Sequence, residues 1–170
     1  MGQKYAILDK VGFPIAFYDT DIYGDNIPTN AIEITEEQWI EFINNQGRRY
    51  FDFETKQIKE FNPETMKIID NKVVFKTEDE ILQEKRTVKE NQLKSLVGFL
   101  LSQTDWVIIK LQSMKEEGWS DNEIQVEVQK YQPILEKRKR IREWNEQTEQ
   151  AIQNAKTIEE LEAIKIEFEG

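Results

Sequence analysis

The spacing of the apolar residues changes near residue 77, and this change constrains the fold more than any other feature. Up to residue 76, apolar residues come in short β-forming groups between turn-forming residues, as in KYAIL, RRYFDF and VVFK. From residue 77 onward they recur three and four positions apart, as in Leu93, Leu96, Val97 and Leu100, which is typical of helices. We therefore predict an α+β fold with a β-hairpin-rich head, residues 1–76, followed by an α-helical region, residues 77–170.

Three hairpins and one short helix are predicted in the head. The turns DKVG, ETKQ and DNK each separate two β-forming segments. Thr35 and Gln38 form a capping-box pattern at the start of EEQWIEFINN, and Gly47 stands where a left-handed C-cap is expected. Three apolar residues share one face of this helix: Trp39, Phe42 and Ile43.

Capping-box patterns also predict helix starts in the second region, at Thr77, Ser120 and Thr157. SQTDW predicts an interruption, after which Ser102 or Thr104 caps a short helix that ends near Gly118. Pro133 is expected at or near the start, or at a kink, of a long polar helix over residues 133–156.

Trp144 is the most informative of the four tryptophans, because it interrupts a very polar helix. Trp39, Trp106 and Trp119 are expected in the core. Apolar or small residues recur every seven positions in this helix, at Ile134, Ile141, Thr148 and Ala155. Trp144 and Ala151 lie three positions after the second and third of these residues. The pattern favours packing within a helical hairpin of one chain over a coiled-coil seam between copies in a homo-oligomer, and both interpretations remain open.

The composition limits the chemistry of any site. The chain has no cysteine and no histidine, which excludes disulfides, thiolate metal sites and the commonest general base. Asp19, Asp21 and Gly24 match a calcium-binding loop in register, but Tyr23 and Asn30 occupy the fifth and twelfth positions, where such loops carry oxygen ligands. We predict instead a solvated turn whose Asp and Asn side chains bond to the backbone, with no metal and no cofactor.

Enzymes, nucleic-acid binders and membrane proteins are also disfavoured. No phosphate loop, dinucleotide fingerprint or nucleophile elbow occurs, so no catalytic residue is assigned. The formal net charge is −10, and the basic residues 137–142 ring their helix rather than form one stripe, which argues against nucleic acid. No run approaches the roughly 18 apolar residues of a membrane span. The first ten residues are too polar for a signal peptide, so we expect a protein made inside the cell.

Two segments resemble a known family. GFPIAFYDTDIYGDNIPTNAIEITEEQW resembles the N-terminal segment of bacteriophage tail-fibre assembly proteins and related small phage tail proteins, through its FY pair, its loop before IP and its AIEIT stretch. LLSQTDWVIIK is similar to that family's C-terminal motif, carried here by Thr104, Asp105 and Trp106. The resemblance covers residues 4–52 and 93–115, and the last third of the chain departs from the short family members.

The resemblance implies a non-enzymatic assembly chaperone that binds the tail-fibre polypeptide and assists its folding and trimerisation in the bacterial host cytoplasm. The alternative is a structural fibre or baseplate subunit that stays in the virion tail. By resemblance, the fibre-contacting residues are Tyr18, Ile22, Tyr23 and Pro28. The same residues could instead fold the head. Trp144, from its own helix, is a further candidate for partner binding.

Overall fold

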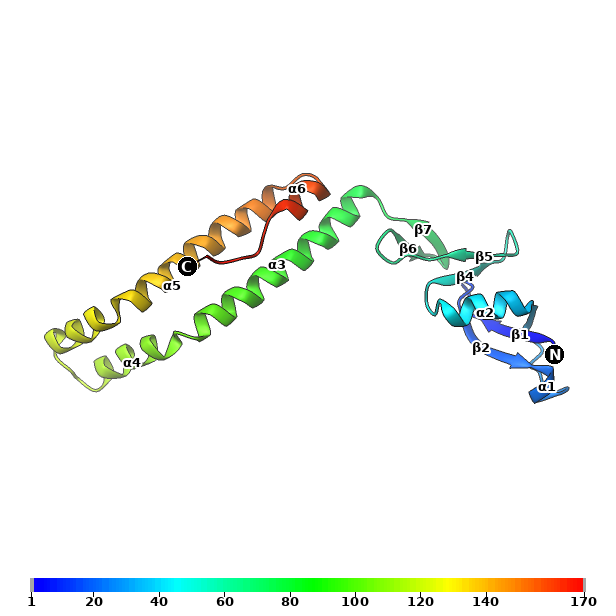
Figure 1. Cartoon of the computed structure of the whole chain (residues 1–170), viewed down its shortest axis with the longest axis horizontal. Coiled ribbons are helices and arrows are strands. Elements are labelled where there is room, and N and C mark those ends of the chain that lie inside the picture. Colours follow the sequence, from blue (N-terminus) through cyan, green and yellow to red (C-terminus); the bar gives the residue numbers. More distant parts are fainter. Residues whose placement is uncertain (1, 170) are drawn as a thin grey trace. The chain divides into compact units, whose positions relative to one another are not determined.

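A computed structural model describes residues 2–169, and the chain divides into two compact units, Met1–Thr77 and Glu78–Gly170. The fold is α+β, as predicted, because every described strand lies in the N-terminal unit and the C-terminal unit is helical (Figure 1). The N-terminal elements are β1 (Lys4–Leu8), β2 (Pro14–Asp19), α1 (Thr20–Tyr23), β3 (Ile32–Ile34), α2 (Glu36–Asn44), β4 (Arg49–Asp52), β5 (Gln57–Glu60), β6 (Met66–Ile69) and β7 (Lys72–Phe75). The C-terminal elements are α3 (Glu78–Ser102), α4 (Asp105–Glu116), α5 (Asp121–Asn154) and α6 (Ile158–Ala163).

The N-terminal unit is built around β1, the central strand of an antiparallel sheet with the order β2-β1-β3. The predicted turn between β1 and β2 is held by Asp9, whose Oδ1 accepts hydrogen bonds from the N–H groups of residues 11, 12 and 13 at 2.8 to 2.9 Å. Gly12 has a φ of 109°, and a Cβ at this position would lie 2.0 Å from the carbonyl oxygen of Phe51. The turn therefore needs glycine, both for its backbone conformation and for the close approach of β4.

The core of this unit lies between the sheet and α2. Ala6, Ile34 and Phe42 are fully buried, and Trp39 packs against them. The predicted capping box of α2 is confirmed, with Thr35 Oγ1 accepting from Gln38 N at 3.2 Å and Gln38 Oε1 accepting from Thr35 N at 2.9 Å. Ile43, predicted on the same face, is exposed, because it lies about 100° around the helix from Phe42, whose side chain points into the core.

The end of α2 differs in detail from the prediction. Gly47 has the expected left-handed backbone, with a φ of 72°. However, the C-cap residue is Asn45, whose side-chain amide donates to the Glu41 carbonyl at 2.9 Å. The left-handed residue thus comes two positions after the cap, where it redirects the chain into β4.

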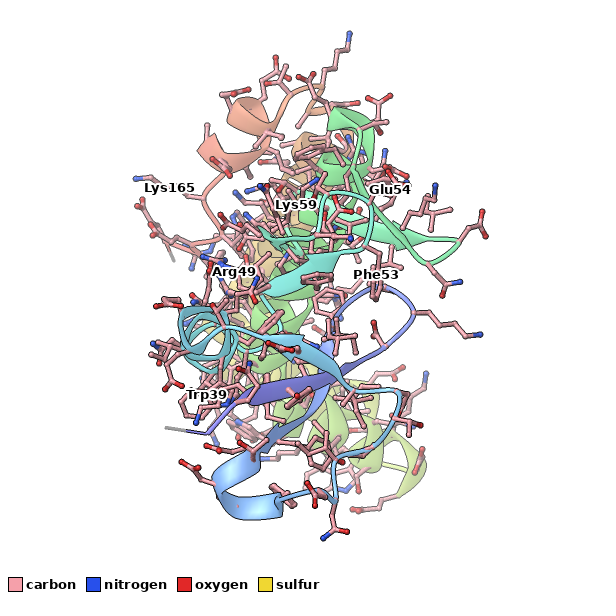
Figure 2. The ribbon with its side chains drawn as sticks, turned by 90° about the vertical axis from the view of Figure 1, so that its right-hand side faces the viewer. Trp39, Arg49, Phe53, Glu54, Lys59 and Lys165 are labelled. Carbon is pink, nitrogen blue, oxygen red and sulfur yellow. The ribbon has the colours of Figure 1, made fainter. Side chains whose placement is uncertain are left out.

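Two separate hairpins, β4–β5 and β6–β7, complete the unit, as the sequence predicted. Asp70 and Asn71 both have positive φ at the β6–β7 turn, as a two-residue hairpin turn of type I′ requires. Arg49 on β4 donates to Glu41 of α2 at 2.9 Å, and Lys59 on β5 pairs with Asp52. Figure 2 labels the Arg49 and Lys59 side chains. The Lys59 ammonium holds the pKa of the Asp52 carboxyl well below its ordinary value.

In the C-terminal unit α3 and α5 run side by side as a helical hairpin, and α6 packs back onto α3 (Figure 1). Its buried core joins these three helices through Leu82, Leu93, Ile152, Ala155 and Leu161. Arg86 of α3 donates to the carbonyls of Ile152 and Ala155 at 3.2 and 2.7 Å, which satisfies acceptors at the end of α5.

The long helix begins earlier than the sequence predicted. The capping box at Ser120 is confirmed, and α5 runs unbroken for 34 residues with Pro133 inside it. Pro133 therefore does not start the helix. Thr157 caps α6 by accepting from Glu160 N at 3.1 Å. Within residues 2–169 no helix is long and apolar enough to cross a membrane.

The face of α5 that carries the seven-residue repeat packs against other helices of the same chain. Ile141 and Thr148 are buried, and Ala155 belongs to the core that α5 shares with α3. This arrangement is the intramolecular hairpin that the sequence favoured.

Candidate functional site

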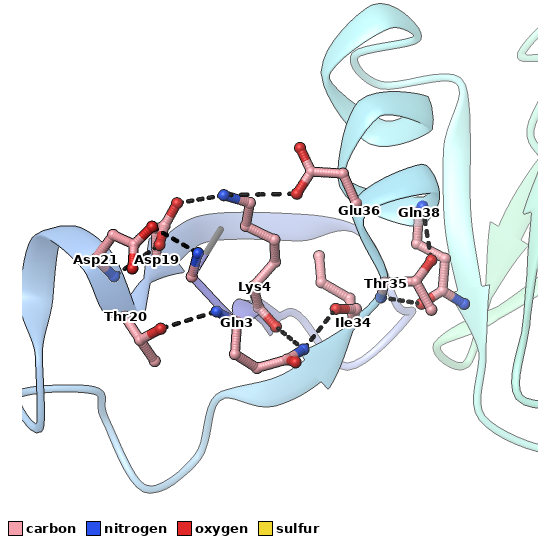
Figure 3. A network of polar contacts seen from close by, with 10 residues as sticks. Gln3, Lys4, Asp19, Thr20, Asp21, Ile34, Thr35, Glu36 and Gln38 are labelled. Carbon is pink, nitrogen blue, oxygen red and sulfur yellow. Dashed lines mark hydrogen bonds and ion pairs between the residues drawn. The ribbon is translucent and has the colours of Figure 1, made fainter.

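The segment after β2, predicted as a turn, forms the four-residue helix α1. Asp19 is its N-cap, and its Oδ1 accepts from Asp21 N at 2.8 Å, which is the predicted bond of an Asp side chain to nearby backbone. Asp21 in turn accepts from Gly2 N at 2.6 Å, and Thr20 Oγ1 accepts from Gln3 N at 2.8 Å (Figure 3). Both carboxylates are therefore engaged with the protein's own donors.

Lys4 ties this segment to the rest of the unit. Its ammonium pairs with Asp19 and lies 3.5 Å from Glu36 Oε2 at the start of α2 (Figure 3). The same ammonium stands 5.1 Å from the centre of the Trp39 ring. The Lys4 side chain is buried although it is charged. The hydrogen bond to Lys4 lowers the pKa of Asp19, and the same bond raises the pKa of Lys4. Strand β1 thus anchors α1 and α2 through one charged group.

Two of the four predicted contact residues in the head project from this anchored segment. The side chain of Ile22 is 76% exposed and that of Tyr23 is 44% exposed. Tyr18 and Pro28 are partly buried, and the Tyr18 and Tyr23 rings meet edge to face at 5.1 Å. We name Ile22, Tyr23 and the supporting Tyr18 the α1 patch. It is an apolar surface on the short helix α1, which the Asp19, Thr20 and Asp21 bonds attach to the rest of the unit.

The described part of the chain contains no group of three or more acidic side chains arranged to hold a metal ion. A pocket with a mostly apolar lining lies elsewhere, in the C-terminal unit.

Trp144, the fifth predicted contact residue, packs within its own unit. It is partly buried against the α3–α5–α6 core, and its ring lies 5.5 Å from that of Phe168. Its apolar surface is thus used in part by the chain's own C-terminal segment. A role for Trp144 in binding a partner stays a prediction.

A pocket between α4 and the start of α5 was missed by the sequence reasoning. Trp106 and Trp119, expected in the core, are instead 49% and 47% exposed and stand on its walls. The pocket has a volume of about 470 Å³, and Ile109 and Met114 supply further apolar surface. Two signals point to it in retrospect: Trp106 and Ile109 are three positions apart on one helix face, and Trp119 directly precedes the capping box at Ser120.

A buried arginine fixes the helix break beside this pocket. Arg138 Nη1 donates to the Leu101 carbonyl, to Thr104 Oγ1 and to Asp105 Oδ1, at 2.9, 2.7 and 2.8 Å. Thr104 is the N-cap residue of α4, as predicted, but its hydroxyl makes no capping bond because it donates to Leu101 and accepts from Arg138. The Thr-Asp-Trp motif is therefore held by a side chain 33 residues away in sequence from Asp105.

Comparison with known proteins gives a short similarity. No protein-family model matches the chain, and no solved structure matches it. A segment of 31 residues is 52% identical to a segment of a probable tail fiber assembly protein of Shigella phage SfV. The match spans 18% of this chain and 19% of that protein. Over about a fifth of its length, the chain is thus similar to a phage protein named for tail-fibre assembly.

Proposed function

We propose that this protein is a phage tail-fibre assembly chaperone that binds the fibre polypeptide in the bacterial host cytoplasm and assists its folding and trimerisation. The observation that carries the proposal is the α1 patch, an exposed apolar surface held in place by the buried Lys4 and its carboxylate partners. The short similarity to a probable tail fiber assembly protein supports the same conclusion.

In this proposal the protein protects fibre chains that have not yet formed the trimer. A β-rich trimer forms slowly, because its strands pair over long sequence separations, and it exposes unpaired edges and apolar surface until it closes. A partner with a preformed apolar patch covers such surface without the entropy cost of ordering that patch on binding. The formal net charge of −10 favours solubility of this chain.

The exposure of its apolar side chains supports a binding role for the α1 patch. Ile22 contributes nothing to the core of its unit, which is formed by other residues. Tyr23 is placed by its contact with Tyr18, and Tyr and similar aromatic residues are enriched where protein interfaces form.

The test is co-expression of the fibre polypeptide with this chain, and the yield of soluble fibre trimer is the measurement. We expect trimer with the wild-type chain and at least a severalfold loss with Ile22→Ser. The matched control is Ile69→Ser, which alters an isoleucine that is also exposed but lies on the β6–β7 hairpin. An unchanged yield when the chain is omitted would refute the proposal.

The same cultures separate the chaperone from a structural subunit. A chaperone is absent from purified particles, whereas a fibre or baseplate subunit is present in a fixed ratio to the fibre. Self-association through the helical unit is a separate proposal, and sedimentation of the purified chain tests it.

A further inference from the structure

The pocket between α4 and α5 has two indole walls that are held in position by the chain itself. The Trp106 ring meets Tyr131 edge to face at 5.2 Å, and the Arg138 bonds fix the residues immediately before it. Two hydrogen bonds hold Trp119 in place. Its backbone N–H donates to the Met114 carbonyl at 3.1 Å, and its indole Nε1 donates to Glu117 Oε2 at 3.1 Å. Both indoles nevertheless stay about half exposed.

Two carboxylates and one ammonium line this pocket: Glu117, Glu127 and Lys110. Glu127 is paired with Lys110 at 2.7 Å and lies 3.7 Å from the Lys130 ammonium, so its charge is compensated. Glu117 has only neutral donors, Ser113 Oγ at 2.7 Å and the Trp119 indole, and no lysine or arginine of residues 2–169 pairs with it. These donors lower the pKa of Glu117, so the carboxylate is charged at neutral pH.

The sequence around the pocket also carries a net negative charge. Residues 105–130 contain six acidic and three basic side chains. A negative surface of this kind favours a basic segment and disfavours an acidic one.

We infer that this pocket binds an arginine side chain of the partner polypeptide, placed between the Trp106 and Trp119 indoles with Glu117 as its counter-ion. Indole faces attract cations, and a guanidinium both stacks on an aromatic ring and donates two hydrogen bonds to a carboxylate. The apolar part of the pocket, with Ile109 and Met114, suits the aliphatic stem of the same side chain.

This inference deepens the proposed function, since it names the chemistry that the chain recognises on its partner. It rests on the proposed function only for the identity of the protein that supplies the arginine. Binding of a short arginine peptide is therefore a test that does not depend on the fibre.

The experiment is a titration of the full-length, 15N-labelled chain with the peptide acetyl-Gly-Leu-Arg-Leu-Gly-amide, followed by NMR of the indole N–H signals. We expect the signals of Trp106 and Trp119 to shift, while those of Trp39 and Trp144 serve as internal references and stay in place. The matched peptide with norleucine in place of arginine should bind at least about fivefold more weakly, as loss of the cation–π and ionic contacts predicts.

Three variants assign the binding. Trp119→Ala and Glu117→Gln should each weaken the arginine peptide by about fivefold or more, and Glu117→Gln should also reduce the salt dependence of binding. Glutamine can still accept the indole hydrogen bond, so this variant keeps the pocket's shape. Phe99→Ala, which removes an aromatic ring that is 61% exposed on α3, is the control and should leave the affinity unchanged. Circular dichroism confirms that each variant is folded.

Several results would overturn the inference. Equal binding of the norleucine peptide would make the pocket a purely apolar site. Shifts of the two indole signals on raising the protein concentration alone would make it a contact between copies of this chain. No shift at millimolar peptide would remove the site, whereas a chain that binds the peptide but does not raise the fibre yield would keep the pocket and refute the chaperone.

Discussion

The two compact units should unfold separately, and a cavity placed in one core tests this. Ile152 is completely buried where α3, α5 and α6 meet. We expect Ile152→Ala to lower the melting temperature of the C-terminal unit alone. Phe42→Ala, in the other core, should lower only that of the N-terminal unit.

The size of the effect follows from the buried side chain. Ile152→Ala removes three carbon atoms from a site with 0% exposure, and at about 0.8 kcal/mol for each buried methylene the lost transfer free energy is about 2.4 kcal/mol. The cavity left behind raises the loss in the free energy of unfolding to about 3 kcal/mol, within the range of such substitutions. For a unit of this size, that loss lowers the melting temperature by about 12–24 °C.

Differential scanning calorimetry of the full chain measures both transitions. Val126→Ala is the control, because this residue of α5 is 65% exposed and its truncation should change the free energy of unfolding by less than about 0.5 kcal/mol. Equal displacement of both transitions by Ile152→Ala would refute the separation into units. A shift as small as that of Val126→Ala would show that the assigned core does not stabilise the helical unit.

Three further outcomes are expected. The hydrogen bond to Lys4 lowers the pKa of Asp19, so the ionised carboxylate stabilises the N-terminal unit above its ordinary pKa of 3.8, and this contribution is lost as pH falls below that value. Asp19→Asn should therefore flatten the acid limb of a plot of melting temperature against pH. An unaltered acid limb would contradict the pairing. Ser120→Ala removes the two hydrogen bonds that the Ser120 hydroxyl makes with Glu123 at the start of α5 and should cost about 1 kcal/mol in urea denaturation, whereas a change below about 0.3 kcal/mol would show that the cap contributes little. Asp105→Ala leaves the buried Arg138 without its carboxylate and should lower the melting temperature more than Arg138→Met, which removes the charge itself; the reverse order in a thermal melt would refute this asymmetry.

Much of the fold could be predicted because it depends on residues that are close in sequence. The hairpin turns, the helix caps at Thr35, Ser120 and Thr157 and the change near residue 77 each involve neighbours a few positions apart. A cap or turn satisfies its hydrogen bonds locally, so its residues identify it without knowledge of the rest of the chain. The seven-residue repeat likewise identified the buried face of α5.

The candidate sites could be predicted only in part. The sequence selected Ile22 and Tyr23 by resemblance, but it left open whether they are buried or exposed. The structure exposes both, because the sheet and α2 fill the core with other side chains. Trp106 and Trp119 were placed in the core on hydrophobicity alone, and their exposure depends on how α4 packs against α5.

The sequence by itself thus determined the type and order of the elements and the location of the helix starts, since these rest on local hydrogen bonding and on the period of the apolar residues. Only the tertiary structure decided that Lys4 joins α1 to α2, that Arg138 holds the break before α4 and that two tryptophans line an open pocket. Each of these joins residues far apart in the chain, and the free energy of such contacts depends on burial and geometry that no local pattern specifies.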